Sequence, residues 1–400
     1  MKFIENVEKK RYQDFCDNFF NNHFCQSYEF GQSTIVGKGQ TPIYVGLEDD
    51  NNVLVAAALL LKKSTPFNMC YFYSPRGFLI DFENTELLTL FTKEIKAYLK
   101  RNKAIYLKID PEIMYQENDI NAHPLPSGKN NFAIFNNLID LGYRHKGFNK
   151  LYEGNQPRYT FRTCLNKSLS EIENNCSKTF LKSIKRSYFY ELEITESDDI
   201  EKFWELNKLI AKKDGFTEYS IDYYKTIYKE FKEADHIKIL NAKIYPDLII
   251  KKCENELEKN EDNEEKITRL KKDLETLLPL KDKYPTGLVI ASLITLYTSN
   301  RAWTMYIGND NIGQYTFAGS RLYYESMIDA HNRKLEFWDL FGVCGDPHTK
   351  YKNLANIYDF KRKLGGELIE FIGEFDLVNK PFWYKLLPIL LSIYRKLRRK

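Results

Sequence analysis

The stretch IYVGLEDDNNVLVAAALLL (residues 43–61) contains two apolar runs separated by a short turn of Asp and Asn residues. Two β-rich runs that flank such a turn are typical of a β-hairpin. The chain continues through an apolar segment, 69–75, into residues 83–101, where apolar side chains recur every three or four positions, as on one helix face. Residues 104–110 return to a β-rich run. This order of hairpin, third strand, crossover helix and fourth strand predicts an α/β unit.

A second part of the chain repeats this order. Its two hairpin strands, third strand, helix and fourth strand are expected at residues 236–246, 287–298, 302–308, 319–334 and 335–341. Both fourth strands end near an acid, Asp110 in the first copy and Asp339 in the second. We therefore predict an α/β fold of two tandem units, in which helices cover mostly antiparallel sheets.

The second copy is interrupted by residues 247–283, which carry two apolar seams with heptad-like spacing. Pro246 and Pro285 bracket this insertion, and an acidic turn at 260–265 separates the two seams. The pattern predicts two helices packed as an antiparallel coiled-coil hairpin. Such a hairpin is either a spacer that packs within the protein or an arm that docks a large partner.

The composition indicates a soluble globular protein of two domains, since 43% of the 400 residues are hydrophobic and 28% are charged. The seven cysteines show neither a CxxC pair nor metal-ligand spacing. We therefore expect reduced thiols in a cytoplasmic protein, with no metal and no cofactor. The first residues lack the apolar segment of a signal peptide, and no apolar run reaches the ~18–20 residues that a membrane-spanning helix needs.

Positive charge is concentrated in the C-terminal segment 381–400, which carries six cations and no acid. Because the formal net charge is only +4, the rest of the chain is slightly acidic. A general polyanion-binding surface is therefore not indicated, and any basic site must be local. The apolar part of this segment either lies on a membrane interface or packs onto the first domain.

One local basic cluster lies between the two copies, in residues 168–196. Four cations spaced three and four apart share one predicted helix face: Lys178, Lys182, Lys185 and Arg186. A solvated face and a phosphate-binding face both explain this spacing. Ser170 and Glu173 predict a capping box at the start of the segment.

A second cluster lies in YDFKRKLGGELIEFIGEFD (residues 358–376). Three consecutive cations at 361–363 stand between an aromatic pair and a Gly-Gly turn, and LIEFIGEF (368–375) then alternates like one strand. These cations either belong to a solvated turn or hold a negative charge that develops during a reaction.

Six segments are similar, in this order, to the motifs of a known family. They are YSPRGFLIDF (73–82), KIDPEI (108–113), SKTFLKSIKRS (177–187), AKKDGFTEYSIDYY (211–224), MYIG (305–308) and YDFKRKLGGELIEFIGEFDLVNKP (358–381). Over essentially the whole chain they resemble the FemABX family of aminoacyl-tRNA-dependent peptidyltransferases. The resemblance implies two tandem acetyltransferase-like (GNAT-like) domains: residues 1–160 with 372–400, and residues 161–371 with the helical arm 247–283 inserted.

The resemblance also implies an activity and its two substrates. An amino acid would pass from aminoacyl-tRNA to the side-chain amine of the peptidoglycan stem peptide, carried by lipid II or by its UDP-linked precursor. The implied acceptor-binding residues are Lys38, Asp110, Tyr219, Tyr223 and Tyr306. Tyr219 stands where some members have an arginine that holds a phosphate of the precursor. Phe360 and Lys361 match a Phe-Lys pair near the reactive end of the donor, and the basic face of residues 178–186 is expected to contact tRNA.

An aminoacyl ester is already activated, so the chemistry asks for few catalytic groups. The enzyme must position two substrates, stabilise the oxyanion of the tetrahedral intermediate and accept a proton from the attacking ammonium. We predict that Lys361 stabilises the oxyanion and that Asp110 pairs with the ammonium or accepts its proton. Phe360 is predicted to stack on the terminal adenine of the tRNA.

Two other functions remain open from the sequence. A coenzyme-A-dependent N-acyltransferase of the same fold would use a Gly-rich pyrophosphate loop, and the corresponding stretches of this chain contain only isolated glycines. A non-catalytic RNA- or envelope-binding protein would explain the arm and the basic tail, but it gives no role to Asp110 and Lys361. A tail on the membrane would make the protein peripheral on the cytoplasmic face.

Overall fold

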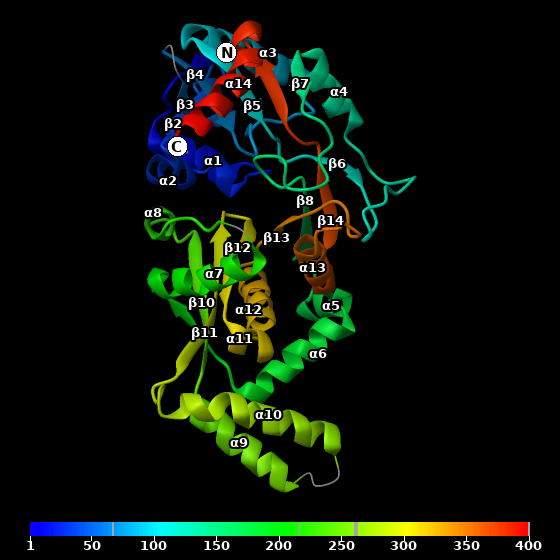
Figure 1. Cartoon of the computed structure of the whole chain (residues 1–400). Helices are drawn as coiled ribbons and strands as arrows, with labels where there is room; N and C mark the ends of the chain where they lie inside the picture. The colour runs from blue at the N-terminus through cyan, green and yellow to red at the C-terminus, as the bar shows by residue number, and fades with distance from the viewer. Residues whose placement is uncertain (66–67, 216, 260–262, 399–400) are drawn as a thin grey trace.

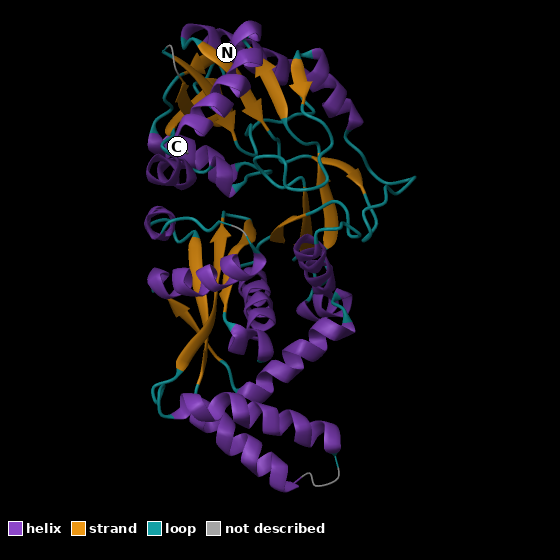
Figure 2. Cartoon of the chain, in the orientation of Figure 1, coloured by secondary structure: helices purple, strands orange, loops and turns teal. Residues whose placement is uncertain are grey.

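The computed structural model describes residues 1–65, 68–215, 217–259 and 263–398. Two α/β units lie one above the other in Figure 1, each built on its own sheet, and we call them the first unit and the second unit. Figure 2 shows helices against both sheets and a pair of helices at the end of the second unit far from the N-terminus. The predicted α/β fold of two tandem units is confirmed.

The first unit contains a seven-stranded sheet in the order β1-β2-β3-β4-β5-β15-β7. Its strands are β1 (Lys2–Ile4), β2 (Thr41–Glu48), β3 (Leu54–Thr65), β4 (Met69–Ser74), β5 (Ala104–Ile109), β7 (Tyr143–His145) and β15 (Phe375–Val378). The predicted hairpin is β2 with β3, and its register places Tyr44 opposite Leu59. Helix α3 (Thr85–Arg101) joins β4 to the parallel strand β5 and buries the apolar face expected from its spacing.

The second unit contains an eight-stranded sheet in the order β6-β14-β8-β13-β12-β11-β10-β9. Its strands are β6 (Met114–Glu117), β8 (Tyr159–Cys164), β9 (Glu193–Ser197), β10 (Ile237–Ile244), β11 (Leu288–Tyr297), β12 (Arg301–Asn309), β13 (Phe337–Val343) and β14 (Glu367–Phe371). Strands β10 and β11 are the antiparallel hairpin pair, and helix α12 (Ala318–Asn332) connects β12 to the parallel strand β13. The repeated order of elements is therefore present in both units.

The C-terminal strands pass from one unit to the other. Strand β14 pairs with β8 in the second sheet, whereas β15 pairs with β5 and β7 in the first sheet. Between them Gly373 has a φ of 86°, a left-handed conformation that glycine adopts without steric cost. The single strand expected at 368–375 is therefore wrong, because this turn divides it. Strand β6, which lies within residues 1–160, pairs with β14 in the second sheet.

The insertion at 247–283 forms two helices, α9 (Pro246–Lys259) and α10 (Glu264–Lys281), which pack against each other. Buried side chains of the two predicted seams are Ile250, Cys253, Leu270 and Leu277. Asp273 is buried beside them and accepts a hydrogen bond of 3.3 Å from Tyr190, in the 3₁₀ turn Tyr188–Tyr190 of the second unit. The predicted turn residues 260–262 lie outside the described residues, and the coiled-coil geometry of the pair stays a prediction.

Apolar side chains of both units form a common core where the units meet. The helices that contribute are α1 (Lys9–Asn18) and α2 (Tyr28–Lys38) of the first unit, and α7 (Ile200–Asp214) and α8 (Ile221–Lys232) of the second. The ring of Phe24, in the 3₁₀ turn Phe24–Gln26, meets the ring of Trp303 on β12 edge-on, with centroids 5.2 Å apart. The two units are therefore held together by buried apolar surface as well as by the chain.

The remaining helices are short, and at one of them, α5, the predicted capping serine lies two residues from the observed one. Their bounds are α4 (Phe132–Asp140), α5 (Leu169–Asn175), α6 (Lys178–Ser187), α11 (Asn311–Tyr315), α13 (Lys352–Lys361) and the 3₁₀ turn Arg362–Leu364. Ser168 caps α5 and exchanges hydrogen bonds with Glu171, whereas Ser170 lies inside the helix. A cap requires extended backbone before the first turn, and Ser168 has that conformation.

Helix α14 (Pro381–Arg398) begins by packing on the first unit. Leu387 is buried with Met69 and Ile105, and the hydroxyl of Tyr384 donates to Asp376 at 2.6 Å. These contacts agree with the alternative in which the tail packs onto the first domain.

The other face of the start of α14 is open to solvent. Phe382 is 71% exposed and Ile389 is 57% exposed. The side chains of residues 391–400, which include the predicted terminal cations, lie outside the described residues. Among the residues that the structure describes, no helix is both long enough and apolar enough to cross a membrane.

Candidate active site

A cavity of about 860 Å³ opens in the second unit. Its wall is formed by α7, by the loop before α8, by β12, by the start of α12 and by α13. Four residues predicted from the motifs line it: Tyr219, Tyr306, Phe360 and Lys361. They come from three separate segments of the chain, so the fold of the second unit brings them together.

Lys361, the last residue of α13, is held at the wall of this cavity by two backbone carbonyls. Its Nζ donates to the carbonyl oxygens of Phe341, at 3.1 Å, and Gly342, at 3.0 Å. Burial lowers the pKa of Lys361 to about 8, although the negative charge of Asp339 acts in the opposite direction. An ammonium has three N–H donors, so two carbonyl partners leave one donor for a bound molecule.

Aromatic side chains supply much of the cavity wall. They are Tyr152, Tyr219, Tyr224, Tyr306, Phe317, Tyr323, Phe341 and Phe360. The ring of Phe360 packs edge-to-face on Tyr323, with centroids 5.2 Å apart, which fixes its orientation. Rings of this kind provide faces on which a nucleobase can stack.

The predicted tyrosines form one connected group. Tyr219 stacks on Tyr223 with centroids 4.1 Å apart, and the hydroxyls of Tyr223 and Tyr306 are 3.1 Å apart. Tyr219 is 44% exposed, whereas Tyr223 is buried, and burial raises the pKa of Tyr223. Tyr219 is therefore the member of this group most accessible to a ligand.

Asp110 lies in the first unit, directly after β5. Its carboxylate accepts hydrogen bonds from the Tyr73 hydroxyl, at 2.7 Å, and from the backbone N–H of Arg76, at 2.6 Å. Burial raises the pKa of Asp110 to about 7, against the opposing charge of Arg76. It borders a separate small cavity with Arg158 and Glu374.

Asp110 and Lys38 are not among the described residues that line the large cavity. Lys38 ends α2 in the first unit, with its Nζ 5.8 Å from the centroid of the Phe30 ring. The structure therefore brings Lys361, Phe360 and the tyrosines together and places the two other predicted residues in the first unit.

The basic face predicted on α6 is exposed in the structure. It consists of Lys178, Lys182, Lys185 and Arg186, and no ion pair joins any of them to another described residue. The Arg186 guanidinium lies 4.8 Å from the centroid of the Phe317 ring, which lines the cavity. The basic face therefore extends to the rim of the cavity.

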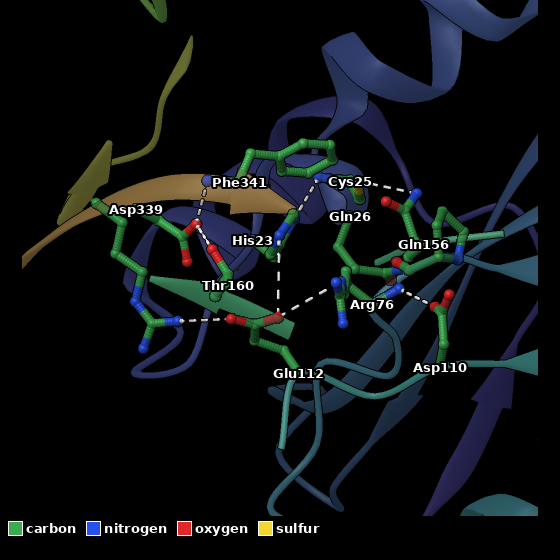
Figure 3. A network of polar contacts seen from close by, with 12 residues as sticks. His23, Cys25, Gln26, Arg76, Asp110, Glu112, Gln156, Thr160, Asp339 and Phe341 are labelled. Atoms are coloured by element: carbon green, nitrogen blue, oxygen red, sulfur yellow. Dashed lines mark hydrogen bonds and ion pairs between the residues drawn. The ribbon is translucent and has the colours of Figure 1, made fainter. Parts of the chain in front are cut away.

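A buried ionic network between the units was not predicted from the sequence. Figure 3 shows Glu112 at its centre. Glu112 forms an ion pair with Arg162 of β8 and faces Arg76 at 3.6 Å, His23 at 3.9 Å and Arg301 at 4.0 Å. Burial alone would raise the pKa of Glu112, but these cations outweigh burial and lower it to about 2. Burial lowers the pKa of His23.

The sequence contained one signal for this network. Glu112 stands two residues after Asp110 in KIDPEI, and Arg76 lies in YSPRGFLIDF. The partners Arg162 and Arg301 belong to no segment that a motif identified. No group of three or more His, Cys, Asp or Glu side chains that could hold a metal ion occurs among the described residues.

Comparisons with known proteins agree over most of the chain. A family model described as the FemAB family matches residues 7–391. A Staphylococcus haemolyticus protein named lipid II:glycine glycyltransferase is 26% identical over 396 residues, which cover 89% of this chain and 90% of that protein. A Staphylococcus aureus protein of the same name is 27% identical, with 88% and 89% covered. The crystal structure of FemX has a TM-score of 0.80 at 22% identity and covers 96% of this chain and 100% of its own, so the fold is shared.

Proposed function

The chain belongs to the FemAB family, and from this we propose that it is an aminoacyltransferase that modifies a peptidoglycan precursor. The donor is an aminoacyl-tRNA, and the acceptor is the side-chain amine of the stem peptide on lipid II or on its UDP-linked form. The names of the relatives support this class of acceptor, since each relative is called a lipid II:glycine glycyltransferase.

The observation that carries the proposal is the position of Lys361. Its ammonium is fixed by two carbonyl oxygens at the wall of an aromatic cavity, and one N–H donor remains for a ligand. A fixed cation beside a space of about 860 Å³ suits a reaction in which negative charge develops on one oxygen atom.

The proposed reaction requires no covalent enzyme intermediate. The neutral acceptor amine attacks the carbonyl carbon of the aminoacyl ester, a C–N bond forms, and the carbonyl oxygen becomes an oxyanion that Lys361 stabilises. The C–O bond to the ribose then breaks, and the ribose oxygen leaves with a proton. The carbonyl double bond re-forms as the ribose leaves, and the proton lost by the attacking amine is the one that the ribose oxygen takes up. Asp110 borders the smaller cavity, so its proposed role is to pair with the ammonium of the acceptor before the reaction.

The donor is proposed to lie along the second unit. The basic face of α6 contacts phosphates of the tRNA, and the terminal nucleoside enters the cavity and stacks on Phe360. The contact of Arg186 with Phe317 supports this path, because it connects the basic face to the cavity rim.

The acceptor is proposed to contact Lys38, Asp110 and the tyrosines 219, 223 and 306. Lys38 on α2 and Tyr223 on α8 lie on helices that pack against each other where the units meet, and Asp110 is hydrogen-bonded to Arg76, which faces Glu112 in the network between the units. A lipid-linked acceptor also gives α14 a role as a peripheral contact with an anionic membrane surface, since Phe382 and Ile389 are exposed.

Single-turnover transfer tests the proposal. The protein is mixed with a panel of charged tRNAs and with either purified lipid II or the UDP-linked pentapeptide, and the mass of the acceptor is measured. We expect one amino acid to be added from at least one charged tRNA. A failure of every charged tRNA, together with acylation of the acceptor from acetyl-coenzyme A, would instead identify a coenzyme-A-dependent N-acyltransferase.

A further inference from the structure

Asp339 of β13 is connected to Lys361 through one intervening residue. Its Oδ1 accepts a hydrogen bond of 2.7 Å from the backbone N–H of Phe341 (Figure 3). The carbonyl of the same Phe341 accepts from Lys361 Nζ at 3.1 Å. Asp339 is buried and is not among the described residues that line the cavity, so it acts on a ligand there only indirectly, through this peptide and through its charge on Lys361.

The backbone at this point has a conformation that needs support. Asp339 pairs with Arg162 and Gly342 pairs with Thr160, so two residues of β13 oppose one residue of β8. This is the pattern of a β-bulge, which re-aims the groups that follow it. Phe341 has a left-handed φ of 56°, which a residue with a side chain keeps only where its surroundings hold it.

The carboxylate that supports the bulge is itself held firmly. The Thr160 hydroxyl donates to Oδ1 at 2.5 Å, and Arg162 approaches Oδ2 with Nε at 3.1 Å and Nη2 at 3.0 Å. Arg162 also pairs with Glu112 of the first unit. A chain of polar contacts therefore runs from the first unit, through Arg162 and Asp339, to the bulge.

We propose that Asp339 is a positioning residue for Lys361: by holding the N–H of Phe341 it fixes the bulge whose carbonyls aim the lysine ammonium into the cavity. Its importance for catalysis rests on the proposed role of Lys361. The inference about position stands on geometry alone and has its own measurement.

The charged and titratable groups near Lys361 set its pKa, which is the quantity to be measured. Asp339 on β13 is the carboxylate that opposes the effect of burial on the pKa of Lys361. Arg162 on β8 is paired with that carboxylate, Asp359 on α13 pairs with Arg362 at 2.8 Å, and Tyr323 packs from α12. Removing the charge of Asp339 should therefore lower the pKa of Lys361 below about 8.

Competitive labelling with acetic anhydride measures this pKa directly. Mass spectrometry of the peptide that contains Lys361, across a pH series, gives the pH midpoint of its reactivity in the folded protein. Asp339→Asn keeps an oxygen that accepts from Phe341 and removes the charge, so the midpoint should fall by about one unit, a typical effect of one nearby charge. Asp329→Asn is the matched control. Asp329 on α12 is also partly buried, and its carboxylate accepts hydrogen bonds from Tyr297 and Arg333.

Kinetics provide the second measurement. Asp339→Ala removes the acceptor for Phe341 N–H, and we expect kcat to fall about 10²-fold, as when one oxyanion partner is lost, with the donor KM changed less than about threefold. Asp339→Asn should keep most of the activity that Asp339→Ala loses, since it keeps the acceptor for Phe341. Asp329→Asn should match the wild type.

The outcomes separate the two proposals. Wild-type kcat in folded Asp339→Ala, or the same Lys361 midpoint in Asp339→Ala as in Asp339→Asn, overturns the positioning role, because both variants lose the charge and only Asn keeps the acceptor for Phe341. Unaltered transfer by Lys361→Met overturns the catalytic role of the lysine, and the difference between the Lys361 midpoints of Asp339→Ala and Asp339→Asn still decides whether Asp339 positions it. If Asp339→Ala does not fold, Thr160→Val, which removes the hydroxyl that donates to the same Oδ1, takes its place, and wild-type kcat with a wild-type Lys361 midpoint in that variant overturns the positioning role.

Discussion

The carboxylate of Glu112 in the first unit forms a buried ion pair with the guanidinium of Arg162 in the second. Two further arginines and a histidine lie within 4.0 Å of the same carboxylate. This pair connects the segment between β5 and β6 to strand β8, at the place where Arg162 also contacts Asp339.

Removal of the Glu112 charge should destabilise the protein. Glu112→Gln leaves buried arginines without their counter-charge, and breaking a buried pair in this way typically costs about 3–5 kcal/mol of the free energy of unfolding. Urea unfolding at pH 7 measures this loss of the free energy of unfolding. Glu5→Gln is the control, because the Glu5–Arg101 pair is exposed and should contribute below about 1 kcal/mol. Equal losses in both variants would contradict the assigned importance of the network.

The lowered pKa of Glu112 predicts how the stability of the protein depends on pH. Its pKa is about 2 in the folded protein and 4.5 as the ordinary value, so the folded state favours the ionised form. The stabilisation is fully present above about pH 4.5 and is lost as the pH falls from 4.5 towards 2. Urea unfolding at a series of pH values should therefore show a steeper acid loss for the wild type than for Glu112→Gln.

Lys361→Met keeps the side-chain length and removes the charge. We expect the single-turnover rate of transfer to fall about 10²–10³-fold, the usual effect of one oxyanion partner, with little change in precursor affinity. Lys363→Met, two residues further along the chain and outside the described lining of the cavity, is the control. A rate equal to that of the wild type would remove Lys361 from the mechanism.

Asp110→Asn should affect the acceptor side only. The pKa of Asp110 is raised to about 7, so the wild-type carboxyl binds a proton below that pH and can no longer pair with the ammonium of the acceptor. Transfer by the wild type should therefore decline as the pH falls below about 7, and the variant should be slow throughout and lack this decline. Loss of tRNA affinity with normal precursor binding would show that the assignment is wrong.

Charge reversal on α6 tests the donor path. Lys178→Glu with Lys182→Glu should weaken tRNA binding and reduce the salt dependence of the affinity by about one ion per lost phosphate contact. Lys93→Glu with Lys100→Glu, on the exposed face of α3 in the first unit, makes the same charge change as a control. Filter binding across a salt series measures the tRNA affinity of both double variants. Equal losses of affinity in the two would indicate a non-specific charge effect.

Membrane contact by α14 is tested with anionic vesicles. The intact protein should co-sediment with them and be released above about 0.5 M salt, where the screening length is only a few Å. Phe382→Ser with Ile389→Ser removes the two exposed apolar side chains and leaves the buried Leu387 in place, so binding should fall in a folded protein. Unchanged binding would show that this face does not contact lipid.

The order of strands and helices was predictable from the sequence because it depends on local periodicity. Both hairpins, both crossover helices and both parallel fourth strands follow from apolar spacing and turn residues within short windows. The cap of α5 was placed two residues late, because Ser and Glu recur at 168–173 and only the backbone shows which serine precedes the helix.

The site was predictable only where a motif carried it. Phe360, Lys361, Tyr219 and Tyr306 were identified from their segments, and the fold gathers them in one cavity. What Lys361 binds was not predictable, because its partners are backbone carbonyls that any residue possesses. Asp110 was linked with Lys361 by motif alone, and the structure places it beside a different, smaller cavity.

Sequence by itself therefore determined the repeated order of strands and helices in the two units and the residue types that the motifs carried. Tertiary structure decided that β6 and β14 share a sheet, that Glu112 pairs with Arg162, and that Asp339 lies beneath the bulge that holds Lys361. The physical reason is the separation along the chain of the residues that interact. Helical and strand patterns are set by neighbours a few positions apart, whereas a buried carboxylate takes whichever cation the packing of distant strands brings within reach.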